Sequence, residues 1–352
     1  LAYDHSEGKA SLIQAFEEAA VPIEIFKKRR GFSLQVVGRI LRTVYREDVC
    51  ILHSHDLGSL MYAVIAAVAT LGKVSVVHTQ HSFPPSEQSL RYKMYRWVFS
   101  LGIDRLSVVS EDVRESYSRF VIKPHRIHVI QNGVEFLNQP TLQRADKMAL
   151  RRSLIESLPE EHRERLQRFV GDLWILYQAR FSPGKGQDHA LTLWKSMRAE
   201  ERQQSVLCMI GPESTEGEYD RIESITRECP DRDRICMLGG SDSPLLWLTV
   251  GDVFLSCSEY EGMPLAPLEA AGCGLPLLLS CIPGHSFLRE NSLQFSLNNI
   301  EEGAESIRSL FAHILHDGPA YRRTLWLKGQ SIRERFSVAE MAHKYASLYA
   351  RT

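Results

Sequence analysis

The chain has 352 residues, of which 44% are apolar and 24% charged, and its formal net charge is -1. This composition is typical of a folded globular protein, and the length indicates two domains. The balanced charge excludes a chain-wide positive field, so nucleic acid is not an expected partner. No apolar run is long enough to span a bilayer, and no secretory signal is visible.

The seven cysteines are scattered and form no C-x-x-C pair. Their odd number argues against a disulfide framework, and their spacing argues against a zinc site. A cytoplasmic location, in which thiols stay reduced, is therefore expected.

Apolar strand patterns alternate with helical stretches along almost the whole chain. Continuous runs of leucine and β-branched residues favour parallel strands that are buried on both faces. Two α/β domains follow, each Rossmann-like and doubly wound, with a ligand cleft expected between them. The polar helical tract near 138–170 separates them, so we predict domains at 1–138 and 139–336. The predicted strands are 22–26, 49–53, 74–78, 105–109 and 127–130, then 173–178, 205–210, 234–238, 253–256 and 276–280.

Two basic segments lie in the first half of the chain. Residues 27–46 combine seven cations with apolar residues at helical spacing, and residues 89–100 combine three cations with aromatic residues. Such segments can lie on an anionic membrane surface. The alternative is an ordinary domain helix whose apolar face points inward.

A basic loop follows the strand predicted at 173–178. Arg180 and Lys185 stand before a helix, and Gly184 and Gly186 allow close approach of the backbone. Arginine and lysine at the carboxyl end of a strand suit a diphosphate. The alternative is a solvated basic turn.

A second loop, SEYEGMPLAPLEAAGCGLP, carries Glu261 and Glu269 on either side of a predicted helix start at Pro267. The N–H groups of Gly262, Met263 and Leu265 there favour an anion. We therefore expect phosphates at the helix start and the two carboxylates on flanking sugars. The alternative makes Glu269 a first-turn acid that only interacts with the helix dipole.

These motifs resemble family 4 retaining glycosyltransferases. The likeness includes the E-x7-E pair, ARFSPGKGQDH with Ala179 in place of the usual glycine, IHVIQNGVEF and a closing FSVAEMAHKYASLY. The resemblance implies a GT-B fold of two facing Rossmann-like domains, with the terminal helix 337–352 packing back on the first. It implies that Arg180 and Lys185 hold the donor diphosphate, that Glu269 binds the ribose and that Glu261 acts at the sugar. Gly211 would belong to a donor-side loop.

Histidines gather after two strands of the first domain. In the family, a residue at the place of His81 contacts the donor sugar, so His81 is the predicted catalytic histidine, with His78 as its rival. His53, His55 and Asp56 would shape the acceptor side or simply end the strand. A zinc site built from His53, His55, His78 and His81 is conceivable by number, but the family requires no metal.

One part of the family pattern is missing, because the chain starts after the usual first strand–helix–strand unit. The first domain is therefore expected to lack that unit.

The predicted activity is transfer of a hexose from a nucleotide-diphosphate sugar, most simply a UDP-sugar, to a cell-envelope or lipid-linked glycan. Retention would come from front-face substitution without a metal or other cofactor, at a peripheral site on the inner membrane face. The alternatives are a GT-B epimerase or hydrolase, and a truncated non-catalytic nucleotide-sugar-binding protein. A nicotinamide enzyme is disfavoured because no G-x-G-x-x-G follows an early strand.

Overall fold

A computed structural model describes residues 2–4, 10–27, 31–84, 90–121, 123–136, 144–316 and 318–352. The chain divides into two compact units. The first unit contains residues 1–108, 113–129 and 347–352, and the second contains residues 109–112 and 130–346. The predicted cleft between two domains stays a prediction, and each unit is described by itself.

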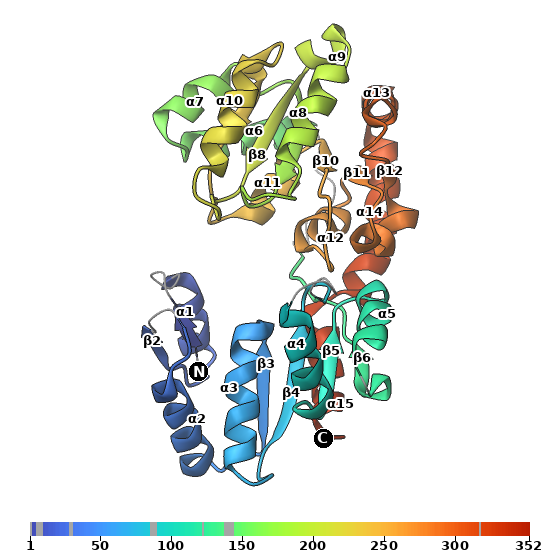
Figure 1. Cartoon of the computed structure of the whole chain (residues 1–352). Coiled ribbons are helices and arrows are strands. Elements are labelled where there is room, and N and C mark those ends of the chain that lie inside the picture. Colours follow the sequence, from blue (N-terminus) through green and yellow to red (C-terminus); the bar gives the residue numbers. More distant parts are fainter. Residues whose placement is uncertain are drawn as a thin grey trace. The chain divides into compact units, whose positions relative to one another are not determined.

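The first unit is built on a parallel sheet of four strands in the order β3-β4-β5-β6 (Figure 1). A separate parallel pair, β1 and β2, precedes it in the chain. Residues up to 129 form β1 (Ala2–Asp4), α1 (Ala10–Glu18), β2 (Ile25–Lys27), α2 (Leu34–Arg46), β3 (Ile51–His55), α3 (Asp56–Ala69), β4 (Ser75–Gln80), α4 (Leu90–Leu101), β5 (Arg105–Val108), α5 (Glu111–Phe120), the 3₁₀ helix η1 (Pro124–Arg126) and β6 (Ile127–Val129).

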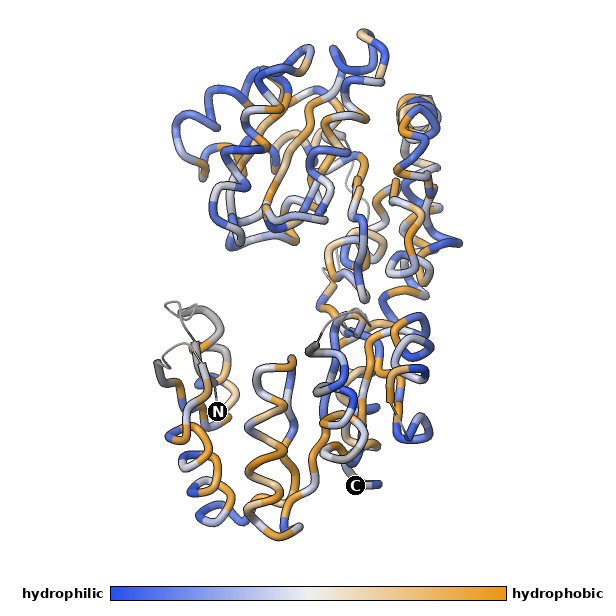
Figure 2. Tube along the Cα trace, viewed as in Figure 1, coloured by the Kyte–Doolittle hydropathy of each residue, from blue (hydrophilic) through white to orange (hydrophobic). Residues whose placement is uncertain are grey.

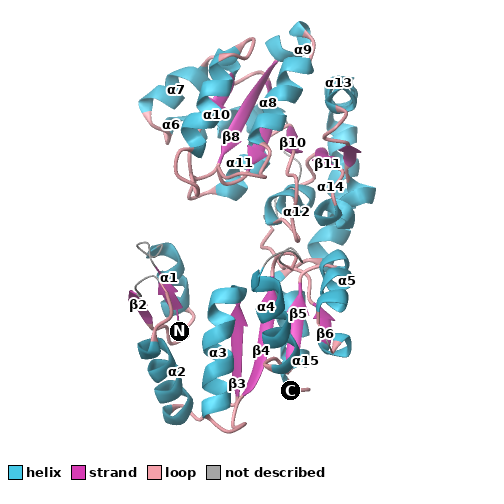
Figure 3. Ribbon diagram, viewed as in Figure 1, coloured by secondary structure: helices cyan, strands magenta, loops and turns pink. Residues whose placement is uncertain are grey.

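The second unit is built on a six-stranded parallel sheet in the order β12-β11-β10-β7-β8-β9, with helices as the connections (Figure 3). Its elements are α6 (Arg144–Glu156), α7 (Glu160–Gln167), β7 (Leu173–Gln178), α8 (Gln187–Ser196), α9 (Ala199–Gln203), β8 (Ser205–Ile210), α10 (Glu218–Arg227), η2 (Arg232–Arg234), β9 (Ile235–Met237), α11 (Pro244–Val250), β10 (Val253–Ser256), α12 (Leu265–Gly272), β11 (Leu277–Ser280), η3 (Pro283–Asn291), β12 (Leu293–Phe295), α13 (Ile300–His316), α14 (Gly318–Arg335) and α15 (Val338–Tyr349). The end of α15, from residue 347 on, belongs to the first unit. After β9 the chain returns to place β10 beside β7. In such sheets, ligands bind at this switch point, beyond the carboxyl ends of the two strands.

Alternation along β7 divides the core of the second unit between the two faces of the sheet. Ile175 and Tyr177 belong to a large cluster that includes residues of α8 and α13. Trp174 points the other way and lies 6.0 Å from Trp247 of α11, measured between ring centroids. In Figure 2 the strands of this sheet run mainly in hydrophobic colours, as expected for a sheet covered on both sides.

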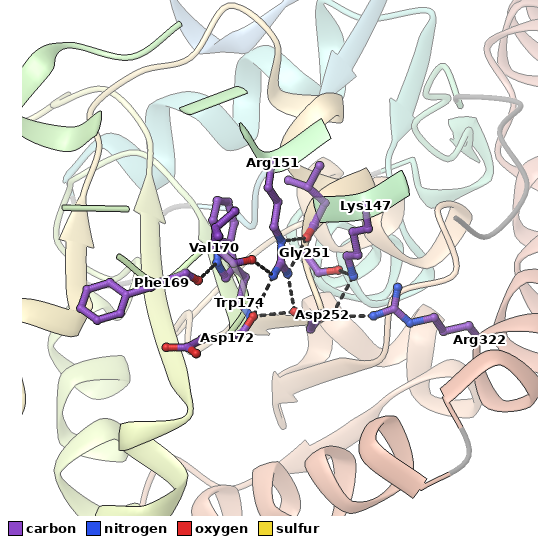
Figure 4. Close-up of polar contacts among 10 residues, drawn as sticks. Lys147, Arg151, Phe169, Val170, Asp172, Trp174, Gly251, Asp252 and Arg322 are labelled. Carbon is purple, nitrogen blue, oxygen red and sulfur yellow. Dashed lines mark hydrogen bonds and ion pairs between the residues drawn. The ribbon is translucent and has the colours of Figure 1, made fainter. Parts of the chain in front are cut away.

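A buried ion cluster closes the amino-terminal end of this sheet. Asp252, just before β10, pairs with Lys147 and Arg151 of α6 and with Arg322 of α14. Lys147 Nζ lies 2.8 Å and an Arg322 nitrogen 2.5 Å from Asp252 Oδ1. Figure 4 shows the three cations converging on the carboxylate, and Arg151 also donating to the Val170 and Asp172 carbonyls.

These contacts shift two pKa values in the cluster. Burial lowers the pKa of Lys147 to about 7, although the Asp252 carboxylate opposes the shift. Burial alone would raise the pKa of Asp252, but the three cations hold it well below its ordinary value. The cluster thus fixes α6 and α14 to the start of β10.

The predicted strands are confirmed, and three of them, at 173–178, 205–210 and 253–256, match to the residue. The strand predicted at 22–26 is β2, which begins three residues later, at Ile25. The short strands β1 and β12 were not predicted. Each has only three residues and pairs with a single neighbour, so neither carries the long apolar run of a central strand.

Residues 34–46 of the basic segment at 27–46 form α2, Lys27 ends β2, and residues 28–30 lie outside the described part. The apolar stripe of α2 faces inward: Val36 and Val37 form a cluster with Tyr62 of α3, and Val44 is buried. The interpretation as an ordinary domain helix therefore holds for α2. On α4, which covers part of the second basic segment, Trp97 is 61% exposed.

Candidate active site

The loops that follow β7 and β10 are joined beneath the switch point by one buried hydroxyl. Tyr177 Oη donates to the carbonyl of Lys185 and accepts from the N–H of Cys257 at 3.2 Å. Burial raises the pKa of Tyr177 well above its ordinary value, so the hydroxyl stays protonated as this role requires. A Cβ atom at Gly186 would lie 1.9 Å from the Cys257 carbonyl oxygen, and the residue has a φ of +74°. Only glycine fits this crossing.

Lys185 and Glu261, predicted to bind different parts of one donor, form an ion pair with each other. Lys185 Nζ lies 2.7 Å from Glu261 Oε1, and the side chains are 22% and 14% exposed. Ser258 Oγ donates to the same oxygen at 2.9 Å. Since an ammonium group has three N–H bonds, Lys185 can keep this pair and still donate to a ligand.

Arg180 stands exposed on the same loop. Among the described residues, no ion pair or hydrogen bond engages its guanidinium group, whereas its carbonyl accepts from Gln187 Nε2 at 2.8 Å. The loop backbone is therefore fixed while the charged group remains available for an anion.

Helix α12 begins at Leu265, two residues earlier than predicted, with Pro264 as the N-cap. Pro267 is the third helical residue, where its missing N–H also costs nothing because helical hydrogen bonding has not yet begun. Within the described residues, no acceptor meets the N–H groups of Gly262, Met263 or Leu265. The expected anion-binding donors are thus present.

The earlier start moves Glu269 out of the first turn, so its predicted position there is wrong. The half-buried carboxylate has no hydrogen-bonding partner among the described residues, and burial raises its pKa. An acidic side chain interacts favourably with the helix dipole only in the first turn. Because Glu269 lies beyond that turn, the interpretation of Glu269 as a purely structural dipole partner loses its main support.

Gly211 joins a third loop to the site. Its N–H donates to the Gly239 carbonyl at 2.7 Å, and a Cβ atom there would lie 2.0 Å from the carbonyl oxygen of Ala179. The loops after β7, β8 and β9 therefore meet beside Arg180.

Three residues that the sequence analysis missed lie at or beside the Glu261 loop. Asn132 Nδ2 donates to the Met263 carbonyl at 3.0 Å. Gly284 packs so closely that a Cβ atom would lie 2.1 Å from the Glu261 carbonyl oxygen. The neighbouring His285 is buried and bonds through Nδ1 to the Ser280 carbonyl at 2.8 Å. The sequence did offer a signal for Gly284 and His285, which follow the strand predicted at 276–280. Because parallel strands end at a common edge of the sheet, residues after that strand could have been expected near the Glu261 loop.

The histidines of the first unit fall into two inner and two outer residues. His78 is buried, with Nδ1 2.9 Å from Ser54 Oγ and Nε2 3.1 Å from Gln80 Oε1. His53 contacts Tyr349 Oη at 2.6 Å and Thr79 Oγ1 at 2.8 Å. Burial, assisted by the neighbouring histidines, lowers the pKa of His53 to about 3, so this ring stays neutral.

The outer residues, His55 and His81, are exposed and in mutual contact, with Nδ1 of His55 3.2 Å from Nε2 of His81. Because both nitrogens of His78 are bonded inside the unit, His81 is the better placed of the two rivals to meet a substrate. Within the described part of the chain, no group of three or more histidine, cysteine or acidic side chains could hold a metal ion.

Two family models match successive parts of the chain. The model described as Glycosyltransferase Family 4 matches residues 3–136, and that described as Glycosyl transferases group 1 matches residues 159–319. The chain belongs to the family 4 glycosyltransferases. The second match contains every donor-binding candidate of this glycosyltransferase, from Arg180 to Glu269.

Among curated relatives, the glycosyltransferase is 26% identical over 285 residues to the Escherichia coli UDP-Gal:alpha-D-GlcNAc-diphosphoundecaprenol alpha-1,3-galactosyltransferase, covering 74% of this chain and 66% of that protein. It is 23% identical to the GDP-mannose:cellobiosyl-diphosphopolyprenol alpha-mannosyltransferase of Xanthomonas oryzae, covering 84% and 73%. The solved structure of Anabaena Alr3699/HepE in complex with UDP-glucose superimposes with a TM-score of 0.80 at 16% identity, covering 98% and 90%. The GT-B fold is thereby shown.

Proposed function

We propose that this chain is a retaining glycosyltransferase that moves a hexose from a UDP-sugar to a lipid-linked or cell-envelope glycan. The observation that carries the proposal is the convergence of cations, free N–H groups and carboxylates at the switch point of the second sheet. Relatives named for transfer to diphosphopolyprenol-linked glycans support the acceptor class. Solved relatives in complex with UDP and UDP-glucose support the donor class.

In this mechanism the donor diphosphate lies against Arg180, Lys185 and the start of α12. Side-chain cations and backbone N–H groups stabilise the negative charge that develops on the leaving diphosphate, so no metal ion is required for that task. Glu269 accepts hydrogen bonds from the ribose. Glu261, held by Lys185 and Ser258, accepts from a hydroxyl group of the transferred sugar.

Retention follows from front-face substitution. The bond between the anomeric carbon and the diphosphate oxygen breaks, the acceptor oxygen bonds to that carbon on the same face, and the acceptor proton passes to the leaving diphosphate. The protein contributes orientation and charge stabilisation. His81 would donate a hydrogen bond to the donor sugar near the reacting carbon.

A donor panel tests the proposal. We expect UDP-galactose or UDP-glucose to raise the melting temperature, and GDP-mannose and ADP-glucose to have little effect. Arg180→Ala and Glu269→Gln should abolish the shift, whereas the exposed helical control Lys195→Ala should retain it. Absence of a shift with every nucleotide sugar would contradict the proposal.

Transfer is then measured with GlcNAc-diphosphoundecaprenol as the acceptor, in the presence of EDTA. We expect UDP release that depends on the acceptor, and a product whose anomeric configuration, read by NMR, equals that of the donor. UDP release without acceptor would favour a hydrolase or epimerase. Binding without any turnover would favour a non-catalytic nucleotide-sugar-binding protein.

A cytoplasmic protein acting on a lipid-linked acceptor would work at a membrane surface. We locate this peripheral contact on α4, where exposed Lys93, Arg96 and Trp97 combine positive charge with an interfacial aromatic ring. No helix within the described residues has the length and apolarity needed to cross a bilayer. Sedimentation with vesicles containing phosphatidylglycerol should be lost in the Trp97→Ser variant at unchanged donor affinity.

A further inference from the structure

The four histidines of β3, β4 and the loop after β4 take part in two separate series of side-chain contacts. One runs from His78 through Gln80 Oε1 to Ser82 Oγ, which accepts from Gln80 Nε2 at 3.0 Å. Gln80 and Ser82 are the chain neighbours of His81, so this series fixes the backbone on both sides of it.

The other series ends on the His81 ring itself. His53 is held at both nitrogens by Tyr349 and Thr79, and its ring lies 4.4 Å from that of His55, measured between centroids. The His55 ring stacks on that of His81 at 5.5 Å with an interplanar angle of 19°. His55 is thus placed by a neutral, fully bonded neighbour, and in turn meets the predicted catalytic ring.

The hydrogen bond between His55 and His81 determines which nitrogen of His81 remains available to a ligand. Only one proton fits between Nδ1 of His55 and Nε2 of His81 at 3.2 Å. Nε2 of His81 is therefore occupied by His55 in either direction of donation. Among the described residues, Nδ1 of His81 has no partner.

We propose that His55 is a positioning residue for His81: it fixes the ring orientation, engages Nε2 and leaves Nδ1 as the nitrogen that meets the donor sugar. The inference rests on the role proposed above for His81. His55 itself touches no substrate in this arrangement. Its role parallels that of partners that orient a working imidazole through its other nitrogen.

The test compares two variants at the exposed position 55. His55→Asn retains a polar group close to the place of Nδ1, whereas His55→Phe retains a stacking ring without a nitrogen. We expect His55→Phe to lower kcat by about 10- to 100-fold at unchanged KM for the UDP-sugar, because the reacting geometry loosens. His55→Asn should stay within about threefold of the wild-type kcat, since the hydrogen bond is retained.

Imidazole ¹⁵N NMR of the unliganded full chain supplies a readout that does not depend on activity. The His81 signals are identified by their loss in His81→Gln. We expect His55→Phe to shift the Nε2 signal of His81 and His55→Asn to restore it in large part. The matched control is His125→Phe, an exposed histidine in η1 before β6, at the opposite edge of the sheet, which should change neither readout.

Two results would overturn the inference: His81 signals that are unchanged in His55→Phe, or a kcat in His55→Asn as low as that in His55→Phe. If the wild-type chain transfers no sugar from any donor, the proposed function fails. The NMR comparison would still decide whether His55 holds His81.

Discussion

Asp252 and Glu261 flank the same strand, β10, and each forms an ion pair with a lysine, yet the two pairs differ in every other respect. Asp252 is almost fully buried and has three cationic partners on two helices. Glu261 has one cation and a serine hydroxyl, and its lysine is partly exposed. Charges sequestered in this way hold elements together, whereas a partly solvated pair can exchange a partner for a ligand. We therefore expect the Asp252 end of the strand to contribute to stability and the Glu261 end to contribute to ligand binding.

The largest expected effect comes from removing the buried carboxylate. Asp252→Ala leaves three cations without their counter-charge, and should lower the free energy of unfolding by about 3–5 kcal/mol. Urea denaturation measures this loss. A reduction below about 1 kcal/mol would show that the cluster does not hold the helices as described.

The next effect separates function from stability at the other end of β10. Lys185→Ala should lower kcat/KM by roughly 100-fold, or about 3 kcal/mol, because one cation facing the leaving diphosphate is lost. The free energy of unfolding should fall by less than in Asp252→Ala, because Glu261 keeps the Ser258 hydrogen bond and some contact with solvent. Steady-state kinetics and urea denaturation are compared with Lys195→Ala. Equal losses of activity in both variants would contradict the assignment.

A smaller, pH-dependent effect follows from Lys147. The unfolded chain keeps this proton up to the ordinary pKa of 10.5, whereas the folded chain releases it above about 7. Between these values the unfolded state binds more protons, so the contribution of Lys147 to the free energy of unfolding rises with pH, by up to about 1.4 kcal/mol per pH unit. The difference between wild type and Lys147→Met should therefore increase from pH 7 to pH 9. A difference that decreases over this range would rule out a lowered pKa.

The smallest effect is expected at an exposed pair of the same unit. On α10, a guanidinium nitrogen of Arg227 lies 2.9 Å from Glu223 Oε2, and both side chains are exposed to solvent. Glu223→Gln should cost only about 0.3–0.5 kcal/mol, and less at high salt. A loss as large as that of Asp252→Ala would mean that burial does not explain the contrast.

The sequence predicted the positions of the strands better than the helix starts and the side-chain pairings. The strand at 173–178 was found to the residue because continuous apolar runs mark buried parallel strands. The start of α12 was misplaced because Pro264 and Pro267 both suit a helix start, and only the backbone decides between them. The ion pair of Lys185 with Glu261 could not be predicted from the sequence. The topology predicts that the loops after β7 and β10 meet, but not which of their side chains form an ion pair.

The cluster at Asp252 shows the same limit more strongly. Lys147 and Arg151 are four residues apart in a polar helix, where they would normally be interpreted as a solvated basic face. Their partner stands about a hundred residues away, and nothing in the local pattern marks it. Likewise, a motif in the sequence was enough to predict a role for His81, but the role proposed for His55 depends on the distance between two rings at the ends of neighbouring strands.

The contact between Asn132 and Met263 has a mechanical consequence. Asn132 lies in the segment that leaves β6, and its side-chain amide donates to the Met263 carbonyl in the loop that bears Glu261, the carboxylate proposed to bind the sugar. The backbone N–H of Asn132 also donates to Met263 Sδ at 3.3 Å, so this residue ties the segment to the loop through two hydrogen bonds. Under the proposed function, a change in the length of that segment is therefore expected to alter donor binding, although more than a hundred residues separate the two positions in the chain.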